Sequence, residues 1–91
     1  MTKYLIIKST ARIEDGMPIS DAMIAYTGNG TFRDCLNVLD ENTRRMIDDG
    51  AIFLDEYDES YSSVKQLIRY FLKRNRTTEW IETWSIKPYT V

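Results

Sequence analysis

Residues 31–50, TFRDCLNVLDENTRRMIDDG, decide the fold that we predict. Thr31 with Asp34 three positions later is typical of a capping box at a helix N-terminus, and Gly50 is a natural C-terminal stop. Between them, apolar side chains recur at helical spacing and form one stripe, which consists of Phe32, Cys35, Leu36, Leu39, Thr43, Met46 and Ile47. This spacing predicts an amphipathic helix with one face on the core.

Two strands are expected before this helix. The segment from Lys3 to Ile13 is apolar on both faces at its centre, around Ile6, which is typical of a strand buried in the middle of a sheet. Residues 14–18, EDGMP, have the composition of a turn. A second, weaker strand is expected from Asp21 to Thr27.

The second half of the chain is predicted to form a strand, a helix and a final strand. Residues 51–54 form a short apolar run that predicts a buried strand, and the acidic residues 55–59 then predict a loop. Ser60 can cap a second helix running to about Asn75, whose apolar face comprises Tyr61, Val64, Leu67, Ile68, Phe71 and Leu72. A last strand, Glu79 to Lys87, carries Trp80, Trp84 and Ile86 on one face, interrupted by Glu82.

The predicted fold class is α+β, with residues 1–91 forming a single domain. The element order is β-β-α-β-α-β, which we interpret as two helices packed on one face of a three- or four-stranded, mainly antiparallel sheet.

The composition argues against catalysis and metal binding. The chain has no histidine, the commonest general base near neutral pH and the commonest ligand of transition metals. Its single cysteine, Cys35, lies on the apolar stripe of the first helix, so we expect a buried thiol and no disulfide. We therefore expect no enzyme, no cofactor and no metal. No apolar run is long enough to cross a bilayer, and a cytoplasmic protein without membrane contact is expected.

The predicted acidic loop is the favoured functional feature. Its residues are Asp55, Glu56, Tyr57, Asp58 and Glu59, in a chain of formal net charge −2. An acidic surface with a tyrosine can imitate nucleic-acid phosphates or meet a basic surface. The leading hypothesis is a small binding or inhibitor protein, immunity-like or phage counter-defence-like. It would occupy a basic surface of a protein that handles nucleic acid.

Two alternatives use other residues. A row of cations on the predicted second helix, with a tyrosine beside it, could bind nucleic acid and comprises Lys65, Arg69, Tyr70, Lys73 and Arg76. The same row of cations would also be found on a helix face that is exposed to solvent and binds no partner. A glycine-containing connection before the first helix could hold a phosphorylated ligand and comprises Gly28, Asn29, Gly30 and Thr31. A tight turn explains it equally well. The sequence leaves the oligomeric state open, a homodimer included.

Overall fold

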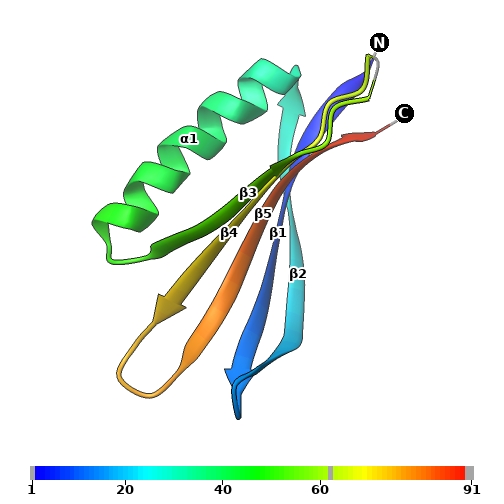
Figure 1. The fold of residues 1–91 in the computed structure, drawn as a ribbon. Helices are drawn as coiled ribbons and strands as arrows, with labels where there is room; N and C mark the ends of the chain where they lie inside the picture. Colours follow the sequence, from blue (N-terminus) through cyan, green and yellow to red (C-terminus); the bar gives the residue numbers. More distant parts are fainter. Residues whose placement is uncertain (1, 62, 90–91) are drawn as a thin grey trace.

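The computed structural model describes residues 2–61 and 63–89, and of residues 20–29 it describes the backbone only. Its elements are β1 (Lys3–Glu14), β2 (Met17–Gly30), α1 (Phe32–Asp48), β3 (Ile52–Asp58), β4 (Leu67–Arg74) and β5 (Glu79–Tyr89). The strands form one antiparallel sheet in the order β2-β1-β5-β4-β3 (Figure 1). The centre of the sheet is therefore β5, and β2 and β3 are its edges.

A tight turn joins β1 to β2. Asp15 and Gly16 both have positive φ, 51° and 77°. Two left-handed residues in a two-residue connection match the twist of the flanking strands, and an Asp-Gly pair adopts that conformation readily. The turn expected over residues 14–18 is confirmed in a shorter form, because both strands continue almost to its tip.

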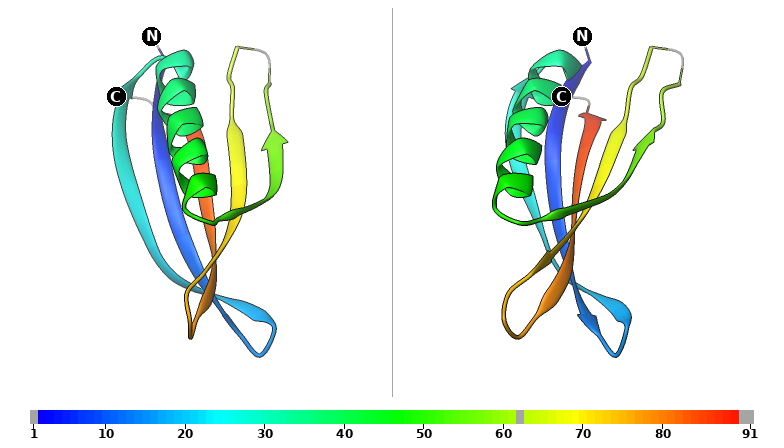
Figure 2. Two further views of the ribbon diagram at one scale, coloured as in Figure 1. Left: turned by 90° about the vertical axis from the view of Figure 1, so that its left-hand side faces the viewer. Right: turned by 60° about the vertical axis from the view of Figure 1, so that its left-hand side comes forward.

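Helix α1 lies across one face of the sheet (Figures 1 and 2). Its capping box is confirmed, since the Thr31 hydroxyl accepts from the Asp34 backbone N–H and the Asp34 carboxylate accepts from the Thr31 N–H, each at 3.1 Å. The predicted stripe is buried at Cys35, Leu39 and Met46. The expectation for Ile47 is wrong, because Met46 takes the core position in the last turn and Ile47 faces outward.

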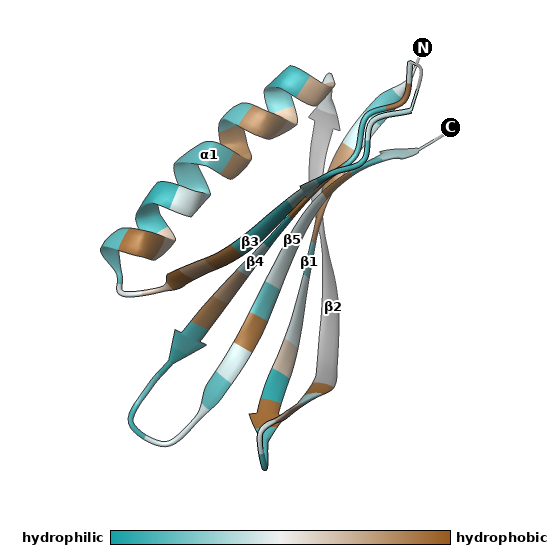
Figure 3. Ribbon diagram, in the orientation of Figure 1, coloured by the Kyte–Doolittle hydropathy of each residue, from teal (hydrophilic) through white to brown (hydrophobic). Residues whose placement is uncertain are grey.

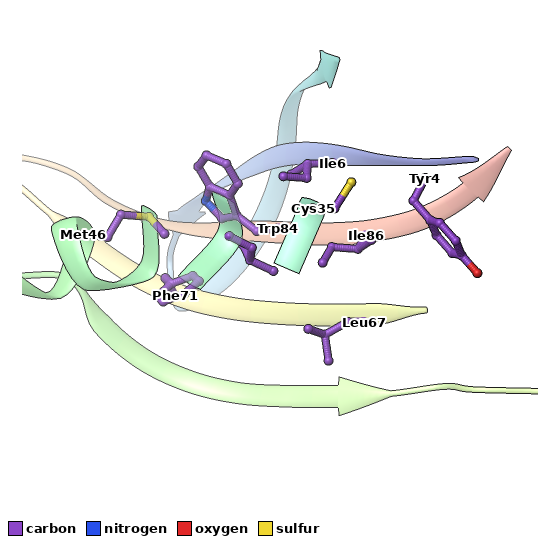
Figure 4. Packing of buried hydrophobic residues seen from close by; sticks show 9 residues of the cluster. Tyr4, Ile6, Cys35, Met46, Leu67, Phe71, Trp84 and Ile86 are labelled. Atoms are coloured by element: carbon purple, nitrogen blue, oxygen red, sulfur yellow. The ribbon is translucent and has the colours of Figure 1, made fainter. Parts of the chain in front are cut away.

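The core lies between α1 and the three inner strands β1, β5 and β4. The helix contributes the three buried residues just named, and the strands contribute Tyr4, Ile6, Leu67, Phe71, Trp84 and Ile86 (Figure 4). Phe71, Leu39 and Ile86 are completely buried. The predicted tryptophan strand is confirmed as β5, and Trp84 is its buried aromatic anchor.

The predicted second helix is wrong. Residues 67–74 form β4, which pairs with β3 on one side and β5 on the other. Leu67 and Phe71 are four apart, which suits a helix, but they also share a face of a strand. The positions between and after them on that face are Arg69 and Lys73, so the alternation typical of a strand is hidden in the sequence.

A strand is present where the buried strand at residues 51–54 was expected, but it is exposed and not buried. It is part of β3, which extends to Asp58 and forms an edge of the sheet, and every residue of β3 is exposed. The predicted fold class is therefore corrected to one helix on a five-stranded antiparallel sheet, in the order β-β-α-β-β-β.

Candidate functional site

The predicted acidic patch lies on the edge strand β3 and the residue after it. Asp55, Glu56, Tyr57 and Asp58 belong to β3, and Glu59 follows directly. β3 begins with hydrophobic residues and becomes hydrophilic along its length (Figure 3). Asp55 lies opposite Tyr70 of β4, whereas Glu56 lies opposite Arg69. Successive residues of a strand point to opposite faces, so the carboxylates lie on both faces of the edge.

One arginine links the acidic strand to the helix. The Arg69 guanidinium contacts Glu56 at 2.6 Å and Asp40 of α1 at 2.8 Å, and it donates to the Thr43 hydroxyl at 3.1 Å. Burial alone would lower the pKa of Arg69, but the bonds to Glu56 and Asp40 outweigh it and raise that pKa. The bridge neutralises part of the acidic surface and links β3 to α1 through a side chain of β4.

The remaining carboxylates of the patch have no cation beside them within the described part of the chain. Asp55 accepts from the Glu56 backbone N–H at 2.8 Å, and Asp58 accepts from the Ser60 hydroxyl at 2.7 Å. A hydrogen bond to Asp55, together with its negative charge, raises the pKa of Tyr57. Asp55, Asp58 and Glu59 therefore present charge that is open to a partner.

A shallow hollow adjoins the acidic strand on the face away from α1. It has a volume of about 310 Å³ and is lined by Leu54, Asp55, Tyr57, Tyr70 and Ile81. The two tyrosine rings meet edge to face, 5.8 Å apart and at 89°. An aromatic-lined hollow next to unpaired carboxylates can hold the aliphatic stem of a lysine or arginine while a carboxylate binds its head.

The predicted basic row does not form, because its helix is absent. Arg69 and Lys73 point to the face that carries α1, and both are paired with carboxylates. Tyr70 points to the opposite face. The Lys65 ammonium lies 5.4 Å from the Phe32 ring, near the N-terminus of α1. Arg76 is in the connection to β5. These five residues are spread along β4 and beyond its two ends.

The glycine-containing connection is not an open loop. Gly28 to Gly30 are the last residues of β2, and Thr31 is the N-cap of α1. The side chain of Asn29 lies outside the described part of the chain. Asp34 occupies the helix N-terminus, where a Cβ on Gly30 would lie 2.7 Å from its carboxylate. A negative side chain already fills the position that an anion would take.

Glu82 was expected only to interrupt the tryptophan strand, but it is the centre of a buried cluster of charges. Its side chain is 3% exposed and accepts from the Trp84 indole at 2.8 Å and the Trp80 indole at 3.3 Å. The ammonium groups of Lys73 and Lys8 lie 3.1 Å and 3.6 Å from Oε1 of Glu82, the oxygen that also accepts from Trp84. Burial alone would raise the pKa of Glu82, but the bonds from Trp84, Lys73 and Trp80 outweigh it and lower that pKa.

The Glu82 cluster explains the acidic residue that interrupts the tryptophan strand. Lys8, Lys73 and Glu82 come from three neighbouring strands, so a glutamate on an otherwise apolar face was the only signal in the sequence. A cavity of about 160 Å³ lies nearby, lined by residues that include Met46, Lys73, Arg74 and Trp80. We interpret the cluster as structural, because every polar group in it is paired inside the fold.

In a chain without histidine, Cys35 and the acidic residues are the side chains that could act as a nucleophile or hold a metal ion. Cys35 is buried, and burial, with the charge of Asp34 as a smaller cause, raises the pKa of its thiol. Among the side chains that the structure describes, which exclude those of residues 20–29, no group of three or more acidic or cysteine side chains is placed to hold a metal ion. Within residues 2–61 and 63–89, no helix has the length and apolarity that a membrane crossing requires.

The chain matches no protein-family model, no curated protein and no solved structure. Its function therefore has to be inferred from its own surfaces.

Proposed function

We propose that the protein is a non-enzymatic binding protein of the cytoplasm, which inhibits a nucleic-acid-handling protein by covering a basic surface with its acidic strand β3. The observation that carries the proposal is that β3 is an edge strand whose residues are all exposed. An inhibitor of this kind needs no chemistry of its own. The absence of histidine and the burial of Cys35 agree with that requirement.

Charge supplies the first argument. Five carboxylates gather here, from Asp40, Asp55, Glu56, Asp58 and Glu59, and Arg69 is the one cation bound among them in the described residues. A surface with this excess of negative charge attracts basic partners over a Debye length of about 8 Å at physiological salt. It also disfavours binding to nucleic acid itself.

The edge supplies the second argument. An edge strand presents unpaired backbone N–H and C=O groups, which can pair with a strand of another protein. Phe53, Leu54 and Tyr57 are 43%, 47% and 51% exposed, so apolar contact area accompanies the charge. Pairing of β3 with β3 of another copy would bring like charges together, which is unfavourable. The geometry therefore favours an extended segment that carries lysine or arginine.

The experiment is affinity capture on the immobilised chain from a lysate of its source, with nuclease treatment to remove nucleic-acid bridges. The test variant carries Asp55→Lys, Asp58→Lys and Glu59→Lys, which leaves the Arg69 bridge to Glu56 intact. We expect the wild type to capture a basic protein in a salt-sensitive manner and the variant to lose it.

The matched control reverses three exposed glutamates elsewhere, Glu14, Glu41 and Glu79, so its net charge changes equally. Both variants must melt cooperatively for the comparison to count. Equal capture by the wild type and the β3 variant would refute the proposal. Equal loss in both variants would show that total charge, and not β3, controls binding.

A further inference from the structure

The hollow beside β3 brings three kinds of surface together. The rings of Tyr57 and Tyr70 are aromatic walls, and Leu54 and Ile81 add aliphatic surface. Among the described residues that line the hollow, Asp55 is the only one that carries a charge. The volume of about 310 Å³ lies at the lower end of the range for ligand pockets, so it suits one side chain better than a longer segment.

The two tyrosine rings leave flat aromatic surface open to a ligand. They meet edge to face, with their centroids 5.8 Å apart and their planes at 89°. In such a pair one ring directs its edge at the face of the other, so the first ring keeps both of its own faces outside the contact. Tyr57 is also 51% exposed. A planar cation can therefore lie flat on a ring of this pair, where the aromatic quadrupole attracts it.

Neighbours on β3 hold Asp55 in place without neutralising it. Its Oδ1 accepts from the Glu56 backbone N–H at 2.8 Å, and the Tyr57 hydroxyl donates to its carboxylate. An ionised carboxylate has about four acceptor positions, so these two bonds leave room for a donor with two N–H groups. Glu56 on the other face of β3 already binds Arg69 of this chain at 2.6 Å, whereas Asp55 has no cation beside it within the described residues.

We propose that the hollow is the binding site for one arginine side chain of the partner, whose guanidinium stacks on a tyrosine ring and donates two hydrogen bonds to Asp55. Leu54 and Ile81 would contact the methylene groups of that arginine. The inference rests on the proposed function, because the arginine belongs to the basic surface that β3 covers.

The shape of the hollow favours arginine over lysine. The hollow is shallow, so water reaches a cation that binds in it. A lysine ammonium is a compact and strongly hydrated point charge, which gains little from such a site. A guanidinium is flat and more weakly hydrated, and its N–H groups lie in its own plane. It can therefore stack on a ring and bind a carboxylate with two N–H groups at the same time.

The experiment is a nuclear magnetic resonance titration of the ¹⁵N-labelled 91-residue chain. The probes are the N-acetyl methylamides of arginine, lysine and citrulline, and citrulline is the uncharged analogue of arginine. We expect the arginine compound to shift the backbone amide signals of residues 54–57, Tyr70 and Ile81. The lysine compound should bind about fivefold more weakly, and the citrulline compound should give no shift confined to the hollow.

Two variants with matched controls locate the site. Asp55→Asn removes the charge and Tyr57→Leu removes a ring, and each should weaken the binding of the arginine compound about tenfold. Asp58→Asn makes the same change of charge on the opposite face of β3, where Asp58 lies across from the core residue Leu67. Tyr61→Leu removes a tyrosine that is 69% exposed and does not line the hollow. Both controls should bind as the wild type does.

Equal binding of the arginine and lysine compounds would overturn the inference, and this comparison needs no variant. So would shifts of equal size at all acidic residues, or an unchanged affinity in folded Asp55→Asn. The inference and the proposed function can fail separately. If folded Tyr57→Leu captures the same basic protein as the wild type, the arginine site is wrong and the proposed function stands. If the arginine compound binds in the hollow but no basic protein is captured, the site stands and the proposed function is wrong.

Discussion

Replacement of Glu82 by glutamine tests the buried charge cluster most directly. The substitution keeps the shape of the side chain and leaves an oxygen that can still accept from the Trp84 indole at 2.8 Å. It removes the negative charge that faces Lys73 at 3.1 Å and Lys8 at 3.6 Å. Two ammonium groups then lie close together without a counter-ion.

The magnitude follows from burial. Breaking a fully buried ion pair costs about 3–5 kcal/mol. Here the carboxylate is 3% exposed, but the lysine side chains are 22% and 26% exposed. Water can therefore recover part of their solvation, which reduces the cost to about 2–3 kcal/mol. For a domain of this size, that loss lowers the melting temperature by roughly 10–20 °C.

The assay is thermal and urea unfolding followed by far-UV circular dichroism. Glu14→Gln is the matched control, because Glu14 pairs with Arg12 at 3.0 Å while both side chains are about half exposed. An exposed pair contributes about 0–1 kcal/mol, so the control should melt within a few degrees of the wild type. If Glu82→Gln also melts within about 4 °C of the wild type, the buried Glu82 charge does not stabilise the fold by about 2–3 kcal/mol.

Three further predictions concern the core, the cap and pH. Phe71→Ala removes a completely buried ring and should cost about 3–5 kcal/mol in urea unfolding, and a loss below about 1 kcal/mol would contradict the described core. Thr31→Ala removes one half of the capping box and should cost about 1 kcal/mol, whereas Thr31→Ser should be nearly neutral, so equal losses would contradict the cap. The lowered pKa of Glu82 implies stability that is present above the unfolded pKa of about 4.3 and is lost as the pH falls through the lower folded value. The stability difference between the wild type and Glu82→Gln should therefore shrink as the pH is lowered below about 4 in urea titrations, and a constant difference would contradict the ionised state of Glu82.

The first half of the chain was predictable because its signals are local. A capping box involves residues three apart, and the stripe of α1 repeats within one element, so both could be derived without knowledge of the rest. The turn at Asp15 and Gly16 is equally local. The strand Glu79–Lys87 was predictable because Trp80, Trp84 and Ile86 all fall on one face of a strand, and the step of two from Trp84 to Ile86 does not suit a helix face.

The second half misled the prediction at β4. A strand with one buried face normally alternates apolar and polar residues, and this strand places Arg69 and Lys73 on the inner face. These cations are tolerated there because carboxylates from other elements bind them, namely Asp40 and Glu56 for Arg69 and Glu82 for Lys73. The paired residues lie on different elements, so their contact cannot be recognised from the local sequence around either residue.

The acidic residues of the candidate site were found from the sequence, since a dense run of like charge needs no structure to be seen. The sequence by itself determined the helix, its cap, the turn and the terminal strand, because each depends on interactions between near neighbours. Only the tertiary structure decided that residues 67–74 form a strand and that the acidic run is a sheet edge. These outcomes depend on which strands lie side by side and on charges that neutralise one another across the fold.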